Sequence, residues 1–243
     1  MVRNLKSTPT AQVELLFRDP SRTMESMRII RQCSIATRLL GVLVGTSLAG
    51  CASVVKVEAE FPQPLIEKIP VRVGVLFDEE LRNYEYYEEI PQQATWTIYI
   101  GNANELMLDR LFDTMFLETA AVESVTLAST DPFELDGVLH PELEKFEFEV
   151  PVGGNDEFVE VWMQYKLRLF EPDGELVTEW PVSGYGKAEL GNKEEALNRA
   201  TVTAMREVGA TISTRFAEQP GVEYWIQERQ DEAALSAETP FNN

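Results

Sequence analysis

A period-two alternation of apolar and polar residues is the clearest pattern in the chain. Apolar side chains occupy every second position over residues 146–150 and again over 159–169, with mostly polar residues between them. Such alternation is typical of strands that have one buried and one solvated face. A glycine-containing loop at 151–156 joins the two segments, so we predict an antiparallel hairpin.

Shorter β-branched segments predict further strands. The tight turn Pro172–Gly174 separates the hairpin from another expected strand at 175–189. The remaining strand candidates lie nearer the N-terminus, at 71–77, 96–100 and 122–127.

Two segments have the spacing of amphipathic helices. The first opens at Asn102, and its apolar positions recur every three or four residues up to Phe116. The second opens at Asn192 and ends before Pro220. An acidic residue stands three positions after each asparagine, as in a capping box. The order of elements predicts an α+β domain over residues 71–220, mainly an antiparallel sheet with two helices packed on one face.

Residues 27–50 have the pattern of an export signal. A basic stretch precedes roughly ten uncharged, mostly apolar residues, too few to cross a bilayer core of about 30 Å as a helix. The segment Leu48–Cys51, with the sequence Leu-Ala-Gly-Cys, follows and resembles the lipobox of bacterial lipoproteins. In that motif the cysteine sulfur accepts diacylglycerol. We therefore predict lipidation at Cys51, with diacylglycerol and an N-linked chain such as palmitate as the anchor.

The signal divides the rest of the chain. Residues 1–26 are polar and are interpreted as an extension upstream of the true start, whereas 51–70 contain three prolines and predict a lipidated tether. Residues 221–243 predict a C-terminal tail. Lipoproteins with an uncharged residue after the cysteine usually go to the outer membrane, so Ala52 implies the periplasmic face of that membrane.

The charge of the chain is strongly negative. Its net charge is -20, and residues 1–50 hold seven of the 21 basic and three of the 41 acidic residues, which leaves -24 from Cys51 onward. Such a surface repels nucleic acid and anionic lipid headgroups. The only other cysteine, Cys33, lies inside the signal, so the exported part contains no intramolecular disulfide.

A search for catalytic chemistry finds no constellation that supports an enzyme. His140 is the only histidine, so a histidine-based triad or a zinc site lacks ligands, and we expect a structural or solvent role for it. The run Asp78–Glu80 lacks the spacing of a calcium loop. We predict a non-enzymatic protein without cofactor or metal, and a hydrolase that uses buried carboxylates is the alternative.

Tyrosines gather in the acidic segment 82–90. Because tyrosine is enriched at protein interfaces, we predict a partner-binding edge, and the alternative is that the rings pack on the sheet. The predicted partner-binding residues are Arg82, Tyr84, Tyr86 and Tyr87. The later cluster Tyr224–Ile226 has the same two interpretations, contact with a partner or lipid, or coverage of the core.

The organisation from about residue 71 to 216 resembles the ABC-type transport auxiliary lipoproteins. The resemblance depends on the lipobox and on three segments, Leu-Phe-Asp-Thr-Met-Phe at 111–116, Phe-Glu-Pro-Asp-Gly at 170–174 and the helix through 196–205. It implies a lipid-anchored periplasmic module that binds an envelope protein complex, such as an ABC transporter, in envelope or lipid transport. The alternative is an assembly or scaffolding lipoprotein of a secretion or surface organelle.

Overall fold

The computed structural model describes residues 52–90, 94–128, 134–151 and 157–238. Every described residue belongs to the compact unit Cys51–Asn243. The predicted upstream extension, the predicted signal and Cys51 itself therefore lie outside the described residues. No helix in the described part of the chain combines the length and the apolarity that crossing a membrane requires.

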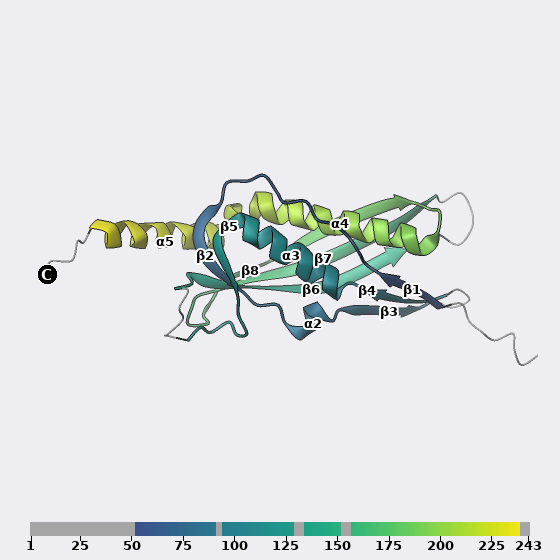
Figure 1. Cartoon of the computed structure of the whole chain (residues 1–243), viewed down its shortest axis with the longest axis horizontal. Coiled ribbons are helices and arrows are strands. Elements are labelled where there is room, and N and C mark those ends of the chain that lie inside the picture. Colours follow the sequence, from purple (N-terminus) through teal and green to yellow (C-terminus); the bar gives the residue numbers. More distant parts are fainter. Residues whose placement is uncertain (1–51, 91–93, 129–133, 152–156, 239–243) are drawn as a thin grey trace, which may run out of the picture. The chain divides into compact units, whose positions relative to one another are not determined.

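The larger sheet has five strands in the order β5-β2-β6-β7-β8 (Figure 1). Their bounds are β2 Ile69–Val75, β5 Phe116–Ala121, β6 Gly137–Glu149, β7 Phe158–Phe170 and β8 Leu176–Glu189. The predicted hairpin is confirmed, because β6, β7 and β8 pair antiparallel over most of their length. The sheet is nevertheless mixed, since β2 runs parallel to both β5 and β6.

A second sheet of three strands has the order β1-β4-β3. Its strands are β1 Ala52–Lys56, β3 Glu85–Glu89 and β4 Thr95–Tyr99. Here the structure differs from the tether expected over 51–70, because β1 pairs parallel with β4 and continues into buried side chains. Val55, Val57 and Phe61 are at most 5% exposed. Burial of three apolar side chains ties this segment to the core, despite the prolines that follow.

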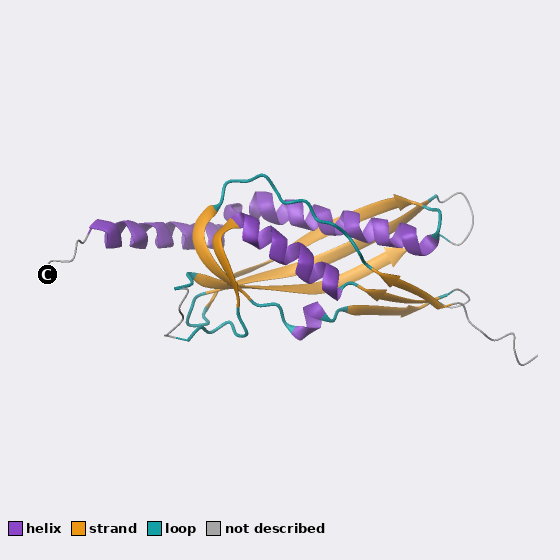
Figure 2. Ribbon diagram, in the orientation of Figure 1, coloured by secondary structure: helices purple, strands orange, loops and turns teal. Residues whose placement is uncertain are grey.

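The helices are α2 Glu79–Arg82, α3 Gly101–Met115, α4 Lys193–Arg215, the 3-10 turn η1 Phe216–Glu218 and α5 Pro220–Glu238. α3 and α4 cover one face of the larger sheet, as Figure 2 shows, so the α+β prediction is confirmed. The Asn192 side chain accepts a hydrogen bond from the Glu195 N–H (3.0 Å), which confirms that cap. The expected cap at Asn102 is wrong, because α3 begins one residue earlier and Ile100 occupies the cap position.

Two further expectations are corrected by the structure. Residues 122–127 form bends, because the chain leaves α3 directly into β5 at Phe116. The expected tail from 221 instead forms α5 up to Glu238. Trp225 is 1% exposed and Ile226 9%, so they cover the core, whereas Tyr224 is exposed.

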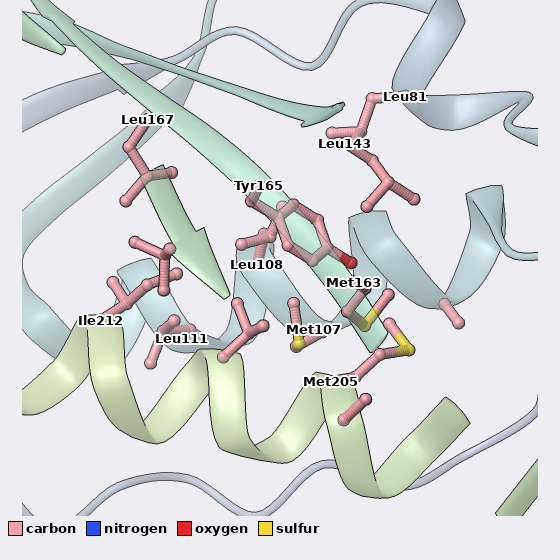
Figure 3. Packing of buried hydrophobic residues seen from close by; sticks show 14 of the residues in the cluster. Leu81, Met107, Leu108, Leu111, Leu143, Met163, Tyr165, Leu167, Met205 and Ile212 are labelled. Atoms are coloured by element: carbon pink, nitrogen blue, oxygen red, sulfur yellow. The ribbon is translucent and has the colours of Figure 1, made fainter. Parts of the chain in front are cut away.

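The core lies between the larger sheet and its helices. The inward side chains of β7, from Val159 to Leu169, are all at most 1% exposed. Figure 3 shows Met163 and Tyr165 among side chains of α3 and α4. The Tyr165 hydroxyl donates to Asn104 Oδ1 on α3 (2.6 Å), and both side chains are fully buried. This bond joins the start of α3 to the middle of the sheet.

Two glycines on β8 set the distance between the sheet and α4. A Cβ atom at Gly186 would lie 1.8 Å from the Ala200 carbonyl oxygen, and one at Gly184 would lie 2.2 Å from the Ala204 carbonyl oxygen. Only glycine allows the helix backbone to come this close to a strand. The segment Gly184–Gly186 therefore has a packing role.

Candidate interface on the three-stranded sheet

One face of the three-stranded sheet is solvent-exposed. Strand register places Val54 of β1, Thr97 of β4 and Tyr87 of β3 in one row across the sheet. The next row consists of Lys56, Tyr99 and Glu85. We call these six residues the outer face. Val54 is 54%, Tyr87 62% and Tyr99 42% exposed.

The opposite face of the same sheet belongs to the core. Because strand side chains alternate between faces, Val55, Trp96 and Ile98 point inward, and each is at most 3% exposed. Tyr86 also points inward, and its ring packs edge-on against Phe146 with a centroid distance of 5.1 Å. Burial and the neighbouring Glu88 carboxylate raise the pKa of Tyr86 to about 12.

A cavity of about 670 Å³ adjoins the outer face. Arg82 and Tyr84 line it from the connection between α2 and β3, and Lys56 lines it from β1. Gly101 allows this arrangement, because a Cβ atom there would lie 1.9 Å from the Arg82 carbonyl oxygen. Its N–H instead donates to the Tyr84 carbonyl oxygen (3.2 Å), which holds the start of α3 against the cavity wall.

The four residues predicted as a partner-binding edge therefore separate into three environments. Tyr87 lies on the outer face, Arg82 and Tyr84 line the cavity, and Tyr86 packs in the core. Arg82 Nε also forms an ion pair with Glu105 Oε1 of α3 (3.2 Å). The packing alternative therefore holds for Tyr86, whereas partner binding by the other three residues stays a prediction.

Sequence reasoning missed the part of the surface that β1 and β4 contribute. Val54 and Lys56 join the outer face only because β1 pairs with β4, whose residues Thr97 and Tyr99 lie 43 positions further along the chain, and Tyr99 joins it through pairing with Glu85 of β3. The signal that could have identified β1 is the alternation Val55-Lys56-Val57, in which two β-branched apolar residues flank an exposed lysine. Three residues are too few for periodicity alone to predict a strand.

His140 belongs to a polar network at the start of β6. Its Nε2 atom lies 3.0 Å from Asp78 Oδ2, and its Nδ1 atom lies 3.8 Å from Glu142 Oε1. Burial alone raises the pKa of Asp78, but hydrogen bonds from the Leu81 N–H and the His140 ring outweigh it and hold that pKa below its usual value.

These three side chains offer ligand-type atoms within 4.8 Å of one another. Three of the four carboxylate oxygens already have partners: the Leu81 N–H donates to Asp78 Oδ1 (2.7 Å), the His140 ring contacts Asp78 Oδ2, and Arg168 binds Glu142 Oε1. These contacts are those of a polar network within the protein. Asp78 thus contacts His140, which lies far away in the sequence, and its sequence neighbours Glu79 and Glu80 do not belong to this group of side chains.

The sequence matches no protein-family model and no curated protein. Among solved structures it is similar to a protein from Xanthomonas campestris of the DUF330 family, with 12% identity over 74% of this chain and 99% of that one and a TM-score of 0.45. It is also similar to a neuraminyllactose-binding hemagglutinin homologue from Helicobacter pylori, with 13% identity, 72% and 100% coverage and a TM-score of 0.49.

A third similar structure is a minor lipoprotein from Acinetobacter baumannii, with 6% identity over 61% of this chain and 92% of that one and a TM-score of 0.35. All three TM-scores are below 0.5.

Proposed function

We propose that the chain is a lipid-anchored, non-enzymatic envelope protein that binds a protein partner through the outer face. The observation that carries the proposal is that β1, which starts at Ala52 directly after the predicted lipidation site Cys51, pairs with β4 as part of the fold. The processed chain of a lipoprotein would begin at that cysteine, so the predicted export signal and the folded unit do not overlap.

The short connection supports a location of the outer face close to the membrane. Adjacent Cα atoms are about 3.8 Å apart, and a strand rises about 3.4 Å per residue. Val54 in the first row of the outer face is three residues from Cys51, so its Cα lies within roughly 11 Å of the cysteine Cα. An anchored chain would hold this surface beside the lipid headgroups.

The composition of the outer face favours a protein partner. It combines two exposed tyrosines and a valine with one lysine and one glutamate, and tyrosine is among the residues enriched in protein interfaces. The net charge of -24 from Cys51 onward opposes insertion into anionic lipid. In this proposal the protein lies on the periplasmic face of the outer membrane and supports an envelope transport complex.

Metabolic labelling tests the anchor. Cells that express the chain are grown with an alkyne analogue of palmitate, and the purified protein is coupled to a fluorophore. We expect label on the wild type and on Cys33→Ser, and none on Cys51→Ser, which should also leave the membrane fraction. Equal labelling of Cys51→Ser would refute the anchor.

Photocrosslinking tests the interface. A photoreactive phenylalanine replaces Tyr87 on the outer face or, as the control, Tyr224 on α5, which is similarly exposed at 68%. We expect the Tyr87 position to capture one defined envelope transport protein and the Tyr224 position not to capture it. Capture of secretion-organelle subunits would favour the scaffolding alternative. Equal capture from both positions would count against the outer face as the interface.

A further inference from the structure

A loop segment crosses α3 and α4 between β1 and β2. We call residues 57–68 the strap (Figure 1). Side chains from the two helices donate hydrogen bonds to its backbone carbonyl oxygens. From α4, Asn198 Nδ2 donates to Glu58 O (3.4 Å) and Arg206 to Glu60 O (3.0 Å). From α3, Arg110 donates to Phe61 O (3.1 Å), and in the opposite direction Lys68 of the strap donates to the Asp113 carbonyl oxygen of α3 (3.0 Å). The strap is therefore fixed to both helices along its length.

An apolar pocket of about 240 Å³ lies beneath the strap. Met107 and Leu111 of α3 and Met205 of α4 line it, together with Phe61 and neighbouring prolines of the strap. Methionine side chains adapt to irregular ligands. The volume is slightly below the range of about 300–1,000 Å³ for small-molecule sites, which suits a thin, unbranched ligand better than a ring system.

Positive charge stands at the rim of this pocket, although the chain as a whole is strongly acidic. Arg206 lines the pocket, and Arg110 donates to Phe61, which also lines it. Among the described residues, the arginines that form ion pairs are Arg72, Arg82, Arg168 and Arg229. A guanidinium has five N–H donors, so Arg206 keeps donors for an anion after its bond to Glu60 O.

We propose that the pocket binds a fatty acid. The apolar chain lies beneath the strap on Met107, Leu111 and Met205, and the carboxylate binds the Arg206 guanidinium at the rim. A guanidinium and a carboxylate form paired, charge-assisted hydrogen bonds, which gives an anionic amphiphile an advantage over a neutral one. The pocket shares no lining residue with the outer face, so its test is independent of the proposed function.

The binding experiment uses a fluorescent fatty acid. The probe is dansyl-undecanoate, and decanoate and decanol are the competitors. The protein is the unit from residue 51 onward with Cys51→Ser, because the core cluster of the described residues lies entirely within this unit. We expect saturable binding with one probe per chain, and decanoate to displace it at an about tenfold lower concentration than decanol.

Three variants separate the contributions of the pocket and of the charge. A Cβ atom at Gly209, which lines the pocket from α4, or at Gly191, outside it, meets no atom within 4 Å. Gly209→Leu would fill the pocket without a backbone clash, so we expect probe affinity to fall at least tenfold, while Gly191→Leu binds as the wild type does. Arg206→Met should abolish the preference for decanoate over decanol.

Three results would overturn the proposal. The first is unchanged probe affinity in Gly209→Leu, with folding verified by circular dichroism. The second is equal displacement by decanoate and decanol in the wild type, which would mean that the pocket accepts any apolar group, including a side chain of a protein partner. Loss of binding in both glycine variants would likewise place the probe elsewhere on the surface.

Discussion

The close contact between β8 and α4 predicts that two glycine-to-alanine substitutions change the free energy of unfolding in opposite directions. At Gly186, the added Cβ would lie 1.8 Å from the Ala200 carbonyl oxygen and 2.6 Å from the Ala204 nitrogen. Both atoms belong to the helix backbone and cannot rotate away. At Gly209, on the same helix, the added Cβ meets nothing within 4 Å. The same chemical change thus tests close packing in one case and only helix propensity in the other.

The magnitudes follow from these geometries. In Gly186→Ala, α4 must move away from β8, which opens gaps around Ala200 and Ala204, both fully buried. Overpacking of this kind costs about 1–3 kcal/mol, and a clash with backbone on the helix side places Gly186→Ala at the upper end. Gly209→Ala should instead stabilise the chain by about 0.5–1 kcal/mol, because alanine loses less backbone entropy in a helix interior.

The assay is urea unfolding of each variant, followed by far-UV circular dichroism and by tryptophan fluorescence. The free energy of unfolding is extrapolated to water from transitions with equal slopes. We expect the two variants to differ by at least about 2 kcal/mol, with the wild type between them. If Gly186→Ala were as stable as the wild type, α4 would not lie against the backbone of β8, and the account of Gly184–Gly186 as a packing device would be wrong.

Three other local features are tested with the same unfolding assay. Tyr165→Phe should lower the free energy of unfolding by about 1–3 kcal/mol, because it leaves the Asn104 oxygen buried without a donor. Adding Asn104→Leu should recover part of that stability, and strictly additive effects of the two substitutions would contradict this. Asn192→Ala should cost about 1 kcal/mol through loss of the α4 cap, whereas Asn192→Asp should cost little. The depressed pKa of Asp78 means that its stabilising effect is complete above about pH 4 and is lost as the pH falls through the folded-state pKa. Asp78→Asn, which can still cap α2, should therefore lose less stability than the wild type on acidification, and parallel pH profiles would contradict this.

The longest elements were predicted correctly because their patterns are local, and the short strand β4 was also predicted, at 96–100. β6 and β7 each have 13 residues and α4 has 23, so their periodicities repeat many times. β1 has five residues, and its pairing with β4 joins positions about 40 residues apart. A strand as short as β1 forms because tertiary partners bury it, and its few alternating residues carry too little of that information.

The candidate interface, too, could be predicted from the sequence only in part. The composition of the tyrosine-rich segment predicts contact either with a partner or with the sheet. Which of the two a given ring makes depends on strand register, because neighbouring residues of a strand point to opposite faces. The register of β3 with β4 places Tyr86 beside Ile98 on the buried face and Tyr87 beside Thr97 on the outer face. The cavity likewise required Gly101, whose close approach to the Arg82 carbonyl oxygen depends on the position of α3.

The absence of a free tether between Cys51 and β1 gives the proposed function its most specific consequence. If the outer face binds a partner at the membrane, its distance from the lipid matters, and an inserted linker should weaken the contact without removing the anchor. A linker of about ten Gly and Ser residues after Cys51 has a root-mean-square length of roughly 17 Å, enough to move the outer face away from the headgroups. We expect full palmitate labelling of this variant but strongly reduced crosslinking from Tyr87. Full crosslinking would mean that the partner binds independently of the membrane, and that the direct start of β1 after Cys51 serves folding alone.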